Sequence, residues 1–460
     1  MSGVRVLHAI HDFLPRHRAG SELYAFQLCR ALAGRHDVAL LCAEYDPARA
    51  HGELVRREHE GLRVLELVNN WRFERFEESH RSVLVAARVG AVLDEVRPDV
   101  LHVHNLLNLT LEVPSLARAR GIPVVATLHD YTLVCPSGGQ RVHVAERHVC
   151  ERIEPERCAR CFGESAFARQ MTIGRRTPRA ALPEGALRAG RALWRRFPRG
   201  GAALARRVAR GDPVTTGEIA ARLRHAAEAI EAVELFVAPS RSLAEEFARL
   251  GIPEAKLRVS DYGFPALGSG VAPARRAPSG RLAIGFVGTL VWHKGAHVLL
   301  EAAARLPRDR FEVLVFGDLA TFPDYAASLR QRAEGLPVRF LGGFASEDAA
   351  RVYAQLDVLV VPSLWPENSP LVIHEAFQAG LPVVGARVGG IPELLEGGRA
   401  GLLYDATSAA ALAACLAELI AAPDRLAALA AAQPAVKTIE QDAAEWEVVY
   451  AAALAKDGRA

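Results

Sequence analysis

The chain has 460 residues, of which 50% are hydrophobic and 24% charged, and its formal net charge is +3. This composition is normal for a soluble globular protein, and the length predicts two domains, with three as the alternative. The balanced charge argues against a nucleic-acid-binding protein. No apolar run approaches the ~20 residues that cross a bilayer, and the N-terminus lacks a signal-peptide pattern. We therefore expect a cytoplasmic protein with reduced or metal-bound cysteines.

Strand and helix patterns alternate along the first 130 residues. In chain order they predict a strand at 4–10, a helix at 21–34, strands at 37–43 and 63–68, a helix at 83–96, a strand at 100–104, a helix at 109–120 and a strand within 122–130. This alternation predicts a parallel sheet with helices on both faces. Ligands of such sheets bind beyond the carboxyl ends of the strands, which here carry His11, His104, His129 and Asp130.

The alternation stops between residues 134 and 231, where no strand is predicted, and we interpret this segment as an insertion. Strand patterns return at 233–238 and 257–260, before a Gly/Pro/Ala-rich linker at 264–280. Six further short apolar strands with intervening helices predict a second doubly wound domain at 281–438.

The segment WPENSPLVIHEAFQAGLPVV, residues 365–384, joins a turn to a helix. Pro370 suits the first turn of a helix, because that turn leaves its N–H groups unpaired. Asn368 or Ser369 is expected to cap the helix with its side chain. Capping does not account for Glu367 and Glu375, which stand eight positions apart.

Three elements in this order carry a resemblance to a known family: GFVGTLVWHKG at 285–295, the E-x7-E pair at 367–375, and GLPVVGARVGGIPELL at 380–395. RAGSE at 18–22, DVLHVHN and TLHD add weaker support. The chain resembles a family 4 retaining glycosyltransferase. The resemblance implies the α/β GT-B fold, in which two Rossmann-like doubly wound domains face a central cleft. Residues 1–268 would bind the acceptor, 281–438 the nucleotide sugar, and the helix in 439–460 would pack back on the N-terminal domain.

The resemblance implies a catalytic set of His129, Lys294 and Glu367. Lys294 would neutralise the departing diphosphate, and His129 would lie near the reacting sugar. Carboxylates accept strong hydrogen bonds from hydroxyls, so Glu367 would face the transferred sugar and Glu375 the ribose. Asp130 would orient His129 or accept a proton.

Donor binding is expected to use two helix starts, because their N–H groups suit a diphosphate. The predicted donor-binding residues are Gly20, Thr289, Gly317, Phe344, Asn368, Ser369, Pro370, Leu371 and Glu375. Thr289 stands where many family members carry an arginine. The charge of the leaving diphosphate would then be offset by Lys294, backbone donors and His293. No Asp-x-Asp occurs, which fits transfer without a catalytic metal. The resemblance implies a nucleotide-sugar donor of the UDP or GDP type. Each of these residues also has a purely structural interpretation, as a capped surface helix, a surface lysine or a strand-end pair.

The 134–231 segment contains two features of its own. Cys135, Cys150, Cys158 and Cys161, the last two in C-x-x-C spacing, fit a structural zinc site. Disulfides, unconnected thiols and an iron–sulfur cluster are the alternatives. The arginine-rich stretch 169–224, with interleaved aromatic residues, predicts peripheral contact with the inner face of the membrane or with a lipid-diphosphate acceptor. A solvated helical face is its alternative, and nucleic acid is disfavoured.

The predicted function is retaining transfer of a sugar from a nucleotide sugar to a hydroxyl of a glycan or lipid-linked acceptor, in surface polysaccharide assembly. Same-face attack by the acceptor is favoured over Glu367 as a covalent nucleophile. Fold alone does not decide activity, so two alternatives stay open. One is a nucleotide-sugar epimerase or sugar phosphorylase on the same fold. The other is a non-catalytic nucleotide-sugar-binding protein.

Overall fold

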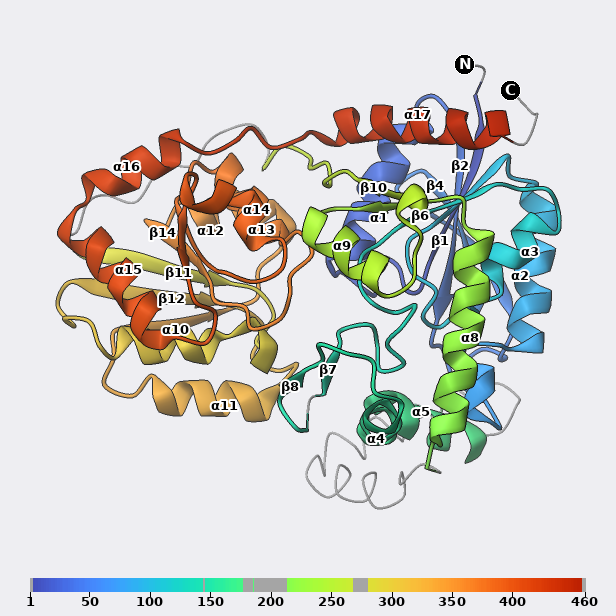
Figure 1. The fold of residues 1–460 in the computed structure, drawn as a ribbon, viewed down its shortest axis with the longest axis horizontal. Coiled ribbons are helices and arrows are strands. Elements are labelled where there is room, and N and C mark those ends of the chain that lie inside the picture. The colour runs from blue at the N-terminus through green and yellow to red at the C-terminus, as the bar shows by residue number, and fades with distance from the viewer. Residues whose placement is uncertain (1–2, 144, 177–184, 186–212, 268–279, 457–460) are drawn as a thin grey trace.

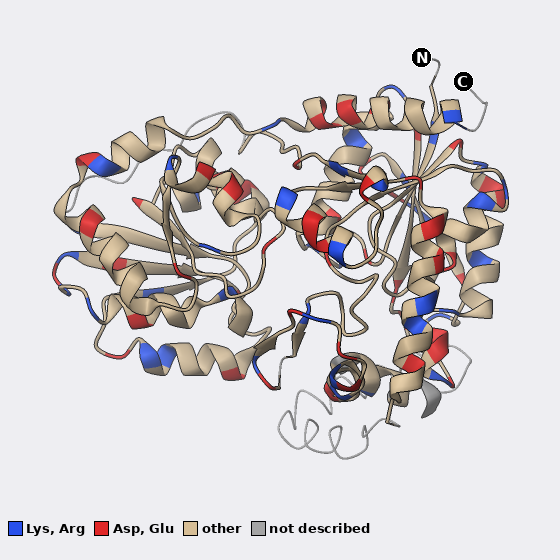
Figure 2. Cartoon of the chain, in the orientation of Figure 1, with Lys and Arg blue, Asp and Glu red and all other residues tan. Residues whose placement is uncertain are grey.

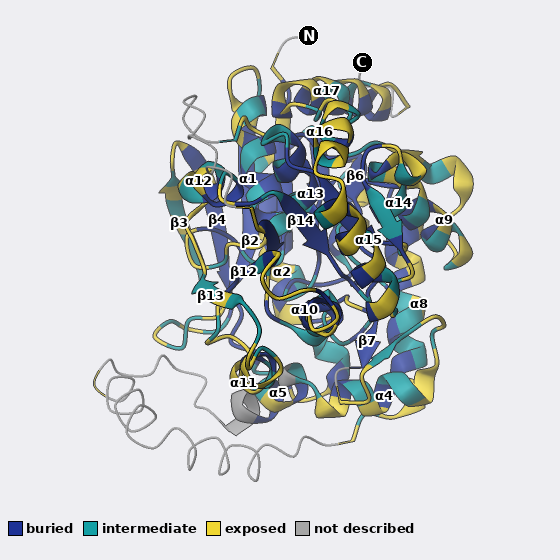
Figure 3. Ribbon diagram, turned by 90° about the vertical axis from the view of Figure 1, so that its left-hand side faces the viewer, coloured by how far each residue is buried: buried dark blue, intermediate teal, exposed yellow. Residues whose placement is uncertain are grey.

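The structure is a computed structural model that describes residues 3–143, 145–176, 185, 213–267 and 280–456. Two α/β lobes lie side by side, and each is built around one large sheet (Figure 1). The predicted fold class, two Rossmann-like doubly wound domains, is confirmed. Both sheets are buried under helices, and the exposed residues lie mainly on the outer helix faces and loops (Figure 3).

The N-terminal sheet has eight strands in the order β10-β9-β6-β5-β1-β2-β4-β3. Their bounds are β1 Arg5–Ile10, β2 Asp37–Glu44, β3 Leu54–His59, β4 Leu62–Val68, β5 Val100–Val103, β6 Val124–Thr127, β9 Leu235–Ala238 and β10 Leu257–Val259. All pairs are parallel except β3 with β4. The central strands are buried along nearly their whole length, which is why they read as continuous apolar runs.

The C-terminal sheet has six parallel strands in the order β13-β12-β11-β14-β15-β16. Their bounds are β11 Leu282–Val287, β12 Phe311–Phe316, β13 Val338–Gly342, β14 Val358–Val361, β15 Val383–Ala386 and β16 Leu402–Tyr404. All six coincide with the predicted strands. A separate two-stranded hairpin pairs β7 Val142–His143 with β8 His148–Val149.

Helices cover both sheets. Their bounds are α1 Gly20–Ala33, α2 Val83–Val96, α3 Val113–Arg118, α4 Pro155–Glu164, α5 Ala166–Arg176, α8 Thr216–Ala232, α9 Arg241–Arg249, α10 Ala296–Ala303, α11 Pro323–Arg332, α12 Ala349–Tyr353, α13 Leu371–Gln378, α14 Ile391–Leu394, α15 Ala409–Ala421, α16 Asp424–Ala431 and α17 Ile439–Lys456. None of the described helices is long and apolar enough to cross a bilayer. Acidic and basic residues are interspersed over both lobes in the view of Figure 2.

Helix α8 corrects the interpretation of residues 134–231 as one insertion. Thr215 and Glu218 form a capping box at its start, and Ala226, Ala229 and Ile230 belong to the core of the N-terminal domain. The helix therefore connects β6 to β9 as an ordinary crossover. Its alanine-rich face carries little apolar signal, so the sequence pattern did not indicate a core helix.

The last helix, α17, returns to the N-terminal domain after the chain has built the C-terminal one (Figure 1). The Tyr24 hydroxyl in α1 donates to Asp442 at 2.8 Å, and the Trp446 indole N–H donates to Tyr24 at 3.0 Å. Trp446 and Tyr450 are buried in the same core cluster as α1. The helix thereby completes the core on one face of the N-terminal sheet.

Candidate active site

A cavity of about 340 Å³ lies between the two domains, at the carboxyl ends of both sheets. The N-terminal domain contributes Gly20, Ser21, His129 and Tyr262 to its wall. The C-terminal domain contributes Phe286, Val287, Gly288, Thr289, Lys294, Val360, Val361, Pro362, Ser363, Trp365, Glu367, Asn368, Ser369, Pro370, Leu371 and Val372. This is the position at which parallel α/β sheets bind ligands.

Lys294 and Glu367 form an ion pair in the cavity wall. The Lys294 Nζ lies 2.7 and 2.9 Å from the two carboxylate oxygens of Glu367. Glu367 is buried and also accepts a hydrogen bond from the Ser363 hydroxyl. Lys294 stays about one-third exposed, and its ammonium lies 5.5 Å from the centre of the Trp365 ring. The pair therefore places a positive charge at the cavity surface and holds the carboxylate behind it.

Helix α13 begins at the cavity without a side-chain cap. Pro370 stands at its N-cap position, and no side chain accepts from the first N–H groups. The expectation that Asn368 or Ser369 would cap it is wrong. The Asn368 amide donates to the backbone carbonyl of His129, and the Ser369 hydroxyl donates to Asp261 at 2.6 Å. Both side chains bind the other domain instead, so the helix end keeps its donors for a ligand.

Helix α1 begins opposite, at Gly20, and it also lacks a side-chain cap. A Cβ atom on Gly20 would come within 2.9 Å of the Leu371 side chain at the start of α13. The glycine thus permits the two helix starts to approach each other across the domain boundary. Two positive helix ends meeting at one cavity favour a ligand with two negative groups, such as a diphosphate.

His129 lines the cavity, but both of its ring nitrogens are already engaged. Nδ1 lies 2.9 Å from the Tyr262 hydroxyl and Nε2 lies 3.0 Å from Nδ1 of His104. Burial lowers the pKa of His129 to about 3, so its imidazole is neutral at physiological pH. Its direct contact with a sugar stays a prediction, and it requires one of these two bonds to break.

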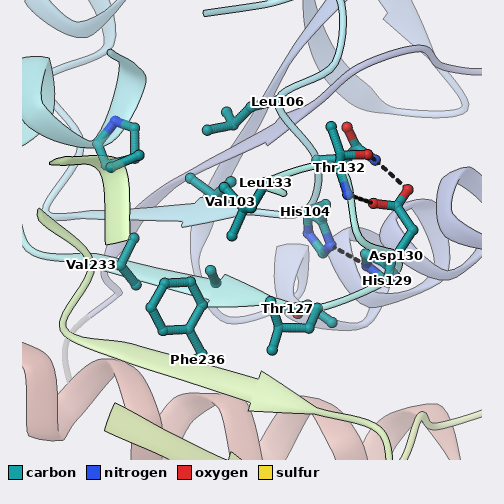
Figure 4. Close-up of a pocket in the computed structure, with 15 residues that line it drawn as sticks. Val103, His104, Leu106, Thr127, His129, Asp130, Thr132, Leu133, Val233 and Phe236 are labelled. Atoms are coloured by element: carbon teal, nitrogen blue, oxygen red, sulfur yellow. Dashed lines mark hydrogen bonds between the residues drawn. The ribbon is translucent and has the colours of Figure 1, made fainter. Parts of the chain in front are cut away.

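Asp130 does not orient the His129 ring, contrary to expectation. Its carboxylate accepts from the Asn105 amide at 2.6 Å and from the Thr132 backbone N–H at 2.7 Å (Figure 4). Burial raises its pKa. Asp130 lines a smaller cavity of about 30 Å³ rather than the cavity between the domains, and His129 lines both. Tyr262 and His104 fix the ring instead.

Three predicted donor-binding residues, Gly317, Phe344 and Glu375, lie in the C-terminal domain but outside the described wall of the cavity. Glu375 accepts a hydrogen bond of 2.6 Å from the buried Tyr353 hydroxyl, and burial raises the pKa of its carboxyl. Phe344 is exposed, with its ring near that of Phe316. His293, considered as a second cation, has its pKa lowered to about 4 by burial and is neutral at physiological pH.

Several residues that sequence reasoning missed join the two domains. Trp365 enters the N-terminal core, where its indole N–H donates to the Gln140 carbonyl. Glu393 of α14 accepts from the backbone N–H groups of Arg241 and Ser242 at 2.8 and 2.6 Å, which adds a carboxylate at the start of α9. Nothing local in the sequence marks these contacts, because each depends on how the two domains meet.

Gly295, which follows Lys294, holds the cavity loop by close packing. Its φ is +73°, and an added Cβ would lie 1.7 Å from the Pro362 carbonyl oxygen. We expect Gly295→Ala to destabilise the C-terminal domain by more than about 2 kcal/mol, measured as a drop in the thermal midpoint. Gly397→Ala is the matched control, because its φ is +67° with no atom within 4 Å, and it should cost only about 1–2 kcal/mol. Equal losses would contradict the packing argument.

The four cysteines of the segment after β6 come together without a bond between them. All are free and half-buried, and burial followed by the neighbouring Cys135 raises the pKa of Cys158 to about 11. Among the described residues, no three of their sulfur atoms lie within 4.8 Å of one another. The zinc site therefore stays a prediction. Most of the arginine-rich stretch lies outside the described residues, as does the membrane contact predicted for it.

Comparisons with known proteins agree with this geometry. The family model for "Glycosyltransferase Family 4" matches residues 18–185, and that for "Glycosyl transferases group 1" matches residues 281–422. The structure of Anabaena HepE in complex with UDP and glucose aligns over 97% of this chain and 100% of its own, at 19% identity and a TM-score of 0.58. Sucrose-phosphate synthase from Thermosynechococcus elongatus aligns over 97% and 96%, at 18% identity and a TM-score of 0.62.

Curated relatives match over a shorter length. The D-inositol 3-phosphate glycosyltransferase of Corynebacterium urealyticum is 37% identical over 173 residues, which are 35% of this chain and 41% of that protein. The corresponding protein of Rhodococcus opacus is 38% identical over 159 residues, 32% of this chain and 35% of its own length. The matched region thus spans less than half of these relatives.

Two parallel α/β domains with a cavity at their facing carboxyl ends define the GT-B class of fold. The family 4 model matches within the N-terminal domain and the group 1 model within the C-terminal domain, so both domains resemble those of glycosyltransferases.

Proposed function

We propose that this protein transfers a sugar from a nucleotide sugar to a hydroxyl group, with retention of the anomeric configuration. The observation that carries the proposal is the Lys294–Glu367 pair, which lies in one cavity with the uncapped starts of α1 and α13. HepE, whose fold this chain shares, binds UDP and glucose.

Charge is the basis of the proposed mechanism. As the bond between the anomeric carbon and the diphosphate breaks, negative charge grows on the leaving group. Lys294 and the N–H groups at the two helix starts stabilise that charge without reorganising. Glu367 holds the ammonium in place and accepts from a sugar hydroxyl. The acceptor hydroxyl attacks the face that the diphosphate leaves, and a diphosphate oxygen takes its proton.

The acceptor is proposed to be an uncharged hydroxyl of a glycan or lipid-linked sugar. Lys294 is the one lysine or arginine in the described cavity wall, and Glu367 already pairs with it. A phosphorylated acceptor, as named for the inositol 3-phosphate enzymes, needs a second cation to offset its charge. Inositol 3-phosphate therefore serves as the comparison acceptor in the assay below.

The test is incubation with UDP- and GDP-sugars, alone, with uncharged hydroxyl acceptors or with inositol 3-phosphate, while the release of nucleoside diphosphate is followed. We expect selective release from one donor, faster with a hydroxyl acceptor, and a product with the anomeric configuration of the donor by NMR. A changed nucleotide sugar formed without an acceptor would establish an epimerase instead. Binding without release from any donor would establish the non-catalytic alternative.

The cysteine cluster is tested separately by metal analysis of the purified protein. Four thiolates bind zinc tetrahedrally, so we expect about one zinc per chain and its loss in Cys158→Ser. Cys415→Ser in α15 is the matched control, because Cys415 is also half-buried but lies in the other domain. Less than about a tenth of an equivalent of zinc or iron would rule out the metal site.

A further inference from the structure

A continuous chain of hydrogen bonds runs from the cavity into the N-terminal core. The Tyr262 hydroxyl lies 2.9 Å from Nδ1 of His129, Nε2 of His129 lies 3.0 Å from Nδ1 of His104, and Nε2 of His104 lies 2.9 Å from Nδ1 of His8. His104 and His129 come from the ends of β5 and β6 (Figure 4). The chain ends at His8, which is fully buried in β1.

The imidazoles of His8, His104 and His129, which form this hydrogen-bond chain, are neutral. Burial lowers the pKa of each, to about 3 for His8 and His129. A neutral imidazole has one N–H and one bare nitrogen. Every bond in the chain must then have the same direction, either toward Tyr262 or away from it.

The buried end of the chain decides that direction. Nε2 of His8 is buried and has no hydrogen-bond partner among the described residues. If the bonds ran inward from Tyr262, this atom would carry a proton with nothing to accept it, and buried orphan N–H groups are rare. If the bonds run outward toward Tyr262, Nε2 of His8 carries no proton and only its lone pair is left unused. The outward direction therefore places the last proton on Nδ1 of His129, which donates to the Tyr262 oxygen.

Tyr262 consequently has a hydroxyl proton to donate. Its oxygen accepts from His129, and no other partner for this hydroxyl is found among the described residues. Burial, followed by the nearby Asp261 carboxylate, raises the pKa of Tyr262 well above the usual value, so the hydroxyl stays protonated. Tyr262 lines the same cavity as Lys294 and Glu367.

We propose that the Tyr262 hydroxyl donates a hydrogen bond to an oxygen of the transferred sugar, and that the His8–His104–His129 chain fixes its direction. This inference rests on the proposed function. It assigns to Tyr262 the sugar contact that the family resemblance implies for His129. His129 is then a positioning residue, because it acts through Tyr262.

A metal site is the competing interpretation of these histidines. The ligand nitrogens of His8, His102 and His104 lie within 4.8 Å of one another. Both ring nitrogens of His102, however, are engaged, with the Tyr450 hydroxyl at 2.8 Å and the Thr127 hydroxyl at 2.8 Å. The hydrogen bonds account for the cluster without an ion.

The first test compares Tyr262→Phe with Tyr450→Phe. Both remove a buried tyrosine hydroxyl bonded to Nδ1 of a histidine, but Tyr450 does not line the cavity. Affinities are measured for UDP and UDP-glucose, or for GDP and GDP-mannose if the enzyme uses guanosine donors. We expect Tyr262→Phe to weaken binding of the nucleotide sugar about tenfold and to leave the nucleoside diphosphate unchanged. Tyr450→Phe should change neither affinity.

An unchanged ratio of the two affinities in Tyr262→Phe would overturn the inference, as would an equal change in Tyr450→Phe. The proposed function is contradicted by a different result, namely a wild-type protein that binds the donor but transfers no sugar. Even then, the two affinities still test the role of Tyr262.

The second test determines the direction of the hydrogen bonds from the tautomers of the three histidines. Long-range ¹H–¹⁵N NMR spectra of histidine-labelled protein distinguish a proton on Nδ1 from one on Nε2. We expect Nδ1–H in His8, His104 and His129. Nε2–H in His129 would mean that Tyr262 donates to the histidine, and the proposal would be wrong.

Discussion

Lys294→Met is expected to lower the kcat for release of the nucleoside diphosphate by about 10²–10³-fold, because one preorganised charge on the leaving group is worth that much. Methionine keeps most of the volume of the stem and removes the ammonium. The KM for the nucleotide sugar should change less than kcat, since charge on the diphosphate is largest in the transition state. The measurement is steady-state kinetics with the donor that the incubation with UDP- and GDP-sugars identifies.

Lys456→Met is the control for this prediction. Lys456 is exposed at the end of α17 and does not line the cavity, so its loss should leave kcat unchanged. Glu367→Gln combined with Lys294→Met gives a double-mutant cycle. If the two residues act as one unit, the double variant should be hardly slower than Lys294→Met alone. Full activity of Lys294→Met would contradict the leaving-group role.

Acidification below pH 6.5 is expected to destabilise the N-terminal domain through its buried histidines. Burial lowers the pKa of His8 and His129 to about 3, and it lowers that of His102 and His104 as well. The unfolded chain then takes up protons between pH 6.5 and 3 that the folded chain does not. The free energy of unfolding therefore falls with falling pH in this window, by about 1.4 kcal/mol per pH unit for each such histidine.

The carboxyl groups of Asp130 and Asp442, whose pKa values burial raises, act in the opposite direction, so the histidine contribution is best measured as a difference. We expect His8→Gln to reduce the pH slope of the unfolding free energy between pH 6.5 and 5 by nearly one proton. Urea unfolding at several pH values measures the slope, which is meaningful even if the variant is less stable. His148→Gln, in the β8 hairpin, controls for the loss of a histidine outside this cluster. An unchanged slope in His8→Gln would contradict the prediction.

Much of the fold could be predicted because the buried strands are short, continuous apolar segments in the sequence. β11, β12 and β14 are covered on both faces, so each is an unbroken apolar run bounded by turns. β3 was missed because its sequence, LVRREH, is half-exposed at the edge of the sheet and carries three charged side chains. Helix α8 was missed as a core element because alanines pack closely without a strong apolar pattern.

The cavity was predicted less completely than the fold. The E-x7-E motif and the Lys294 loop indicated the correct edge of the C-terminal sheet, since that information is local. Asn368 and Ser369 have the composition of helix caps, but tertiary partners on the other domain engaged both side chains. Tyr262 follows a short strand, and no motif surrounds it in the sequence. Only the folded structure shows that its hydroxyl bonds to His129.

The two segments that connect the domains meet at one point. Phe264, which leaves the N-terminal domain, pairs with Thr438, which returns to it; the Phe264 N–H donates to Lys437 and the Ile439 N–H donates to Phe264, at 2.9 and 3.0 Å. Because the two crossings are held together here, any rotation of one domain against the other would use this point as a single hinge. Rotation about that hinge would widen or narrow the cavity while both sheets stay intact, so substrate entry and product release need not disturb either core.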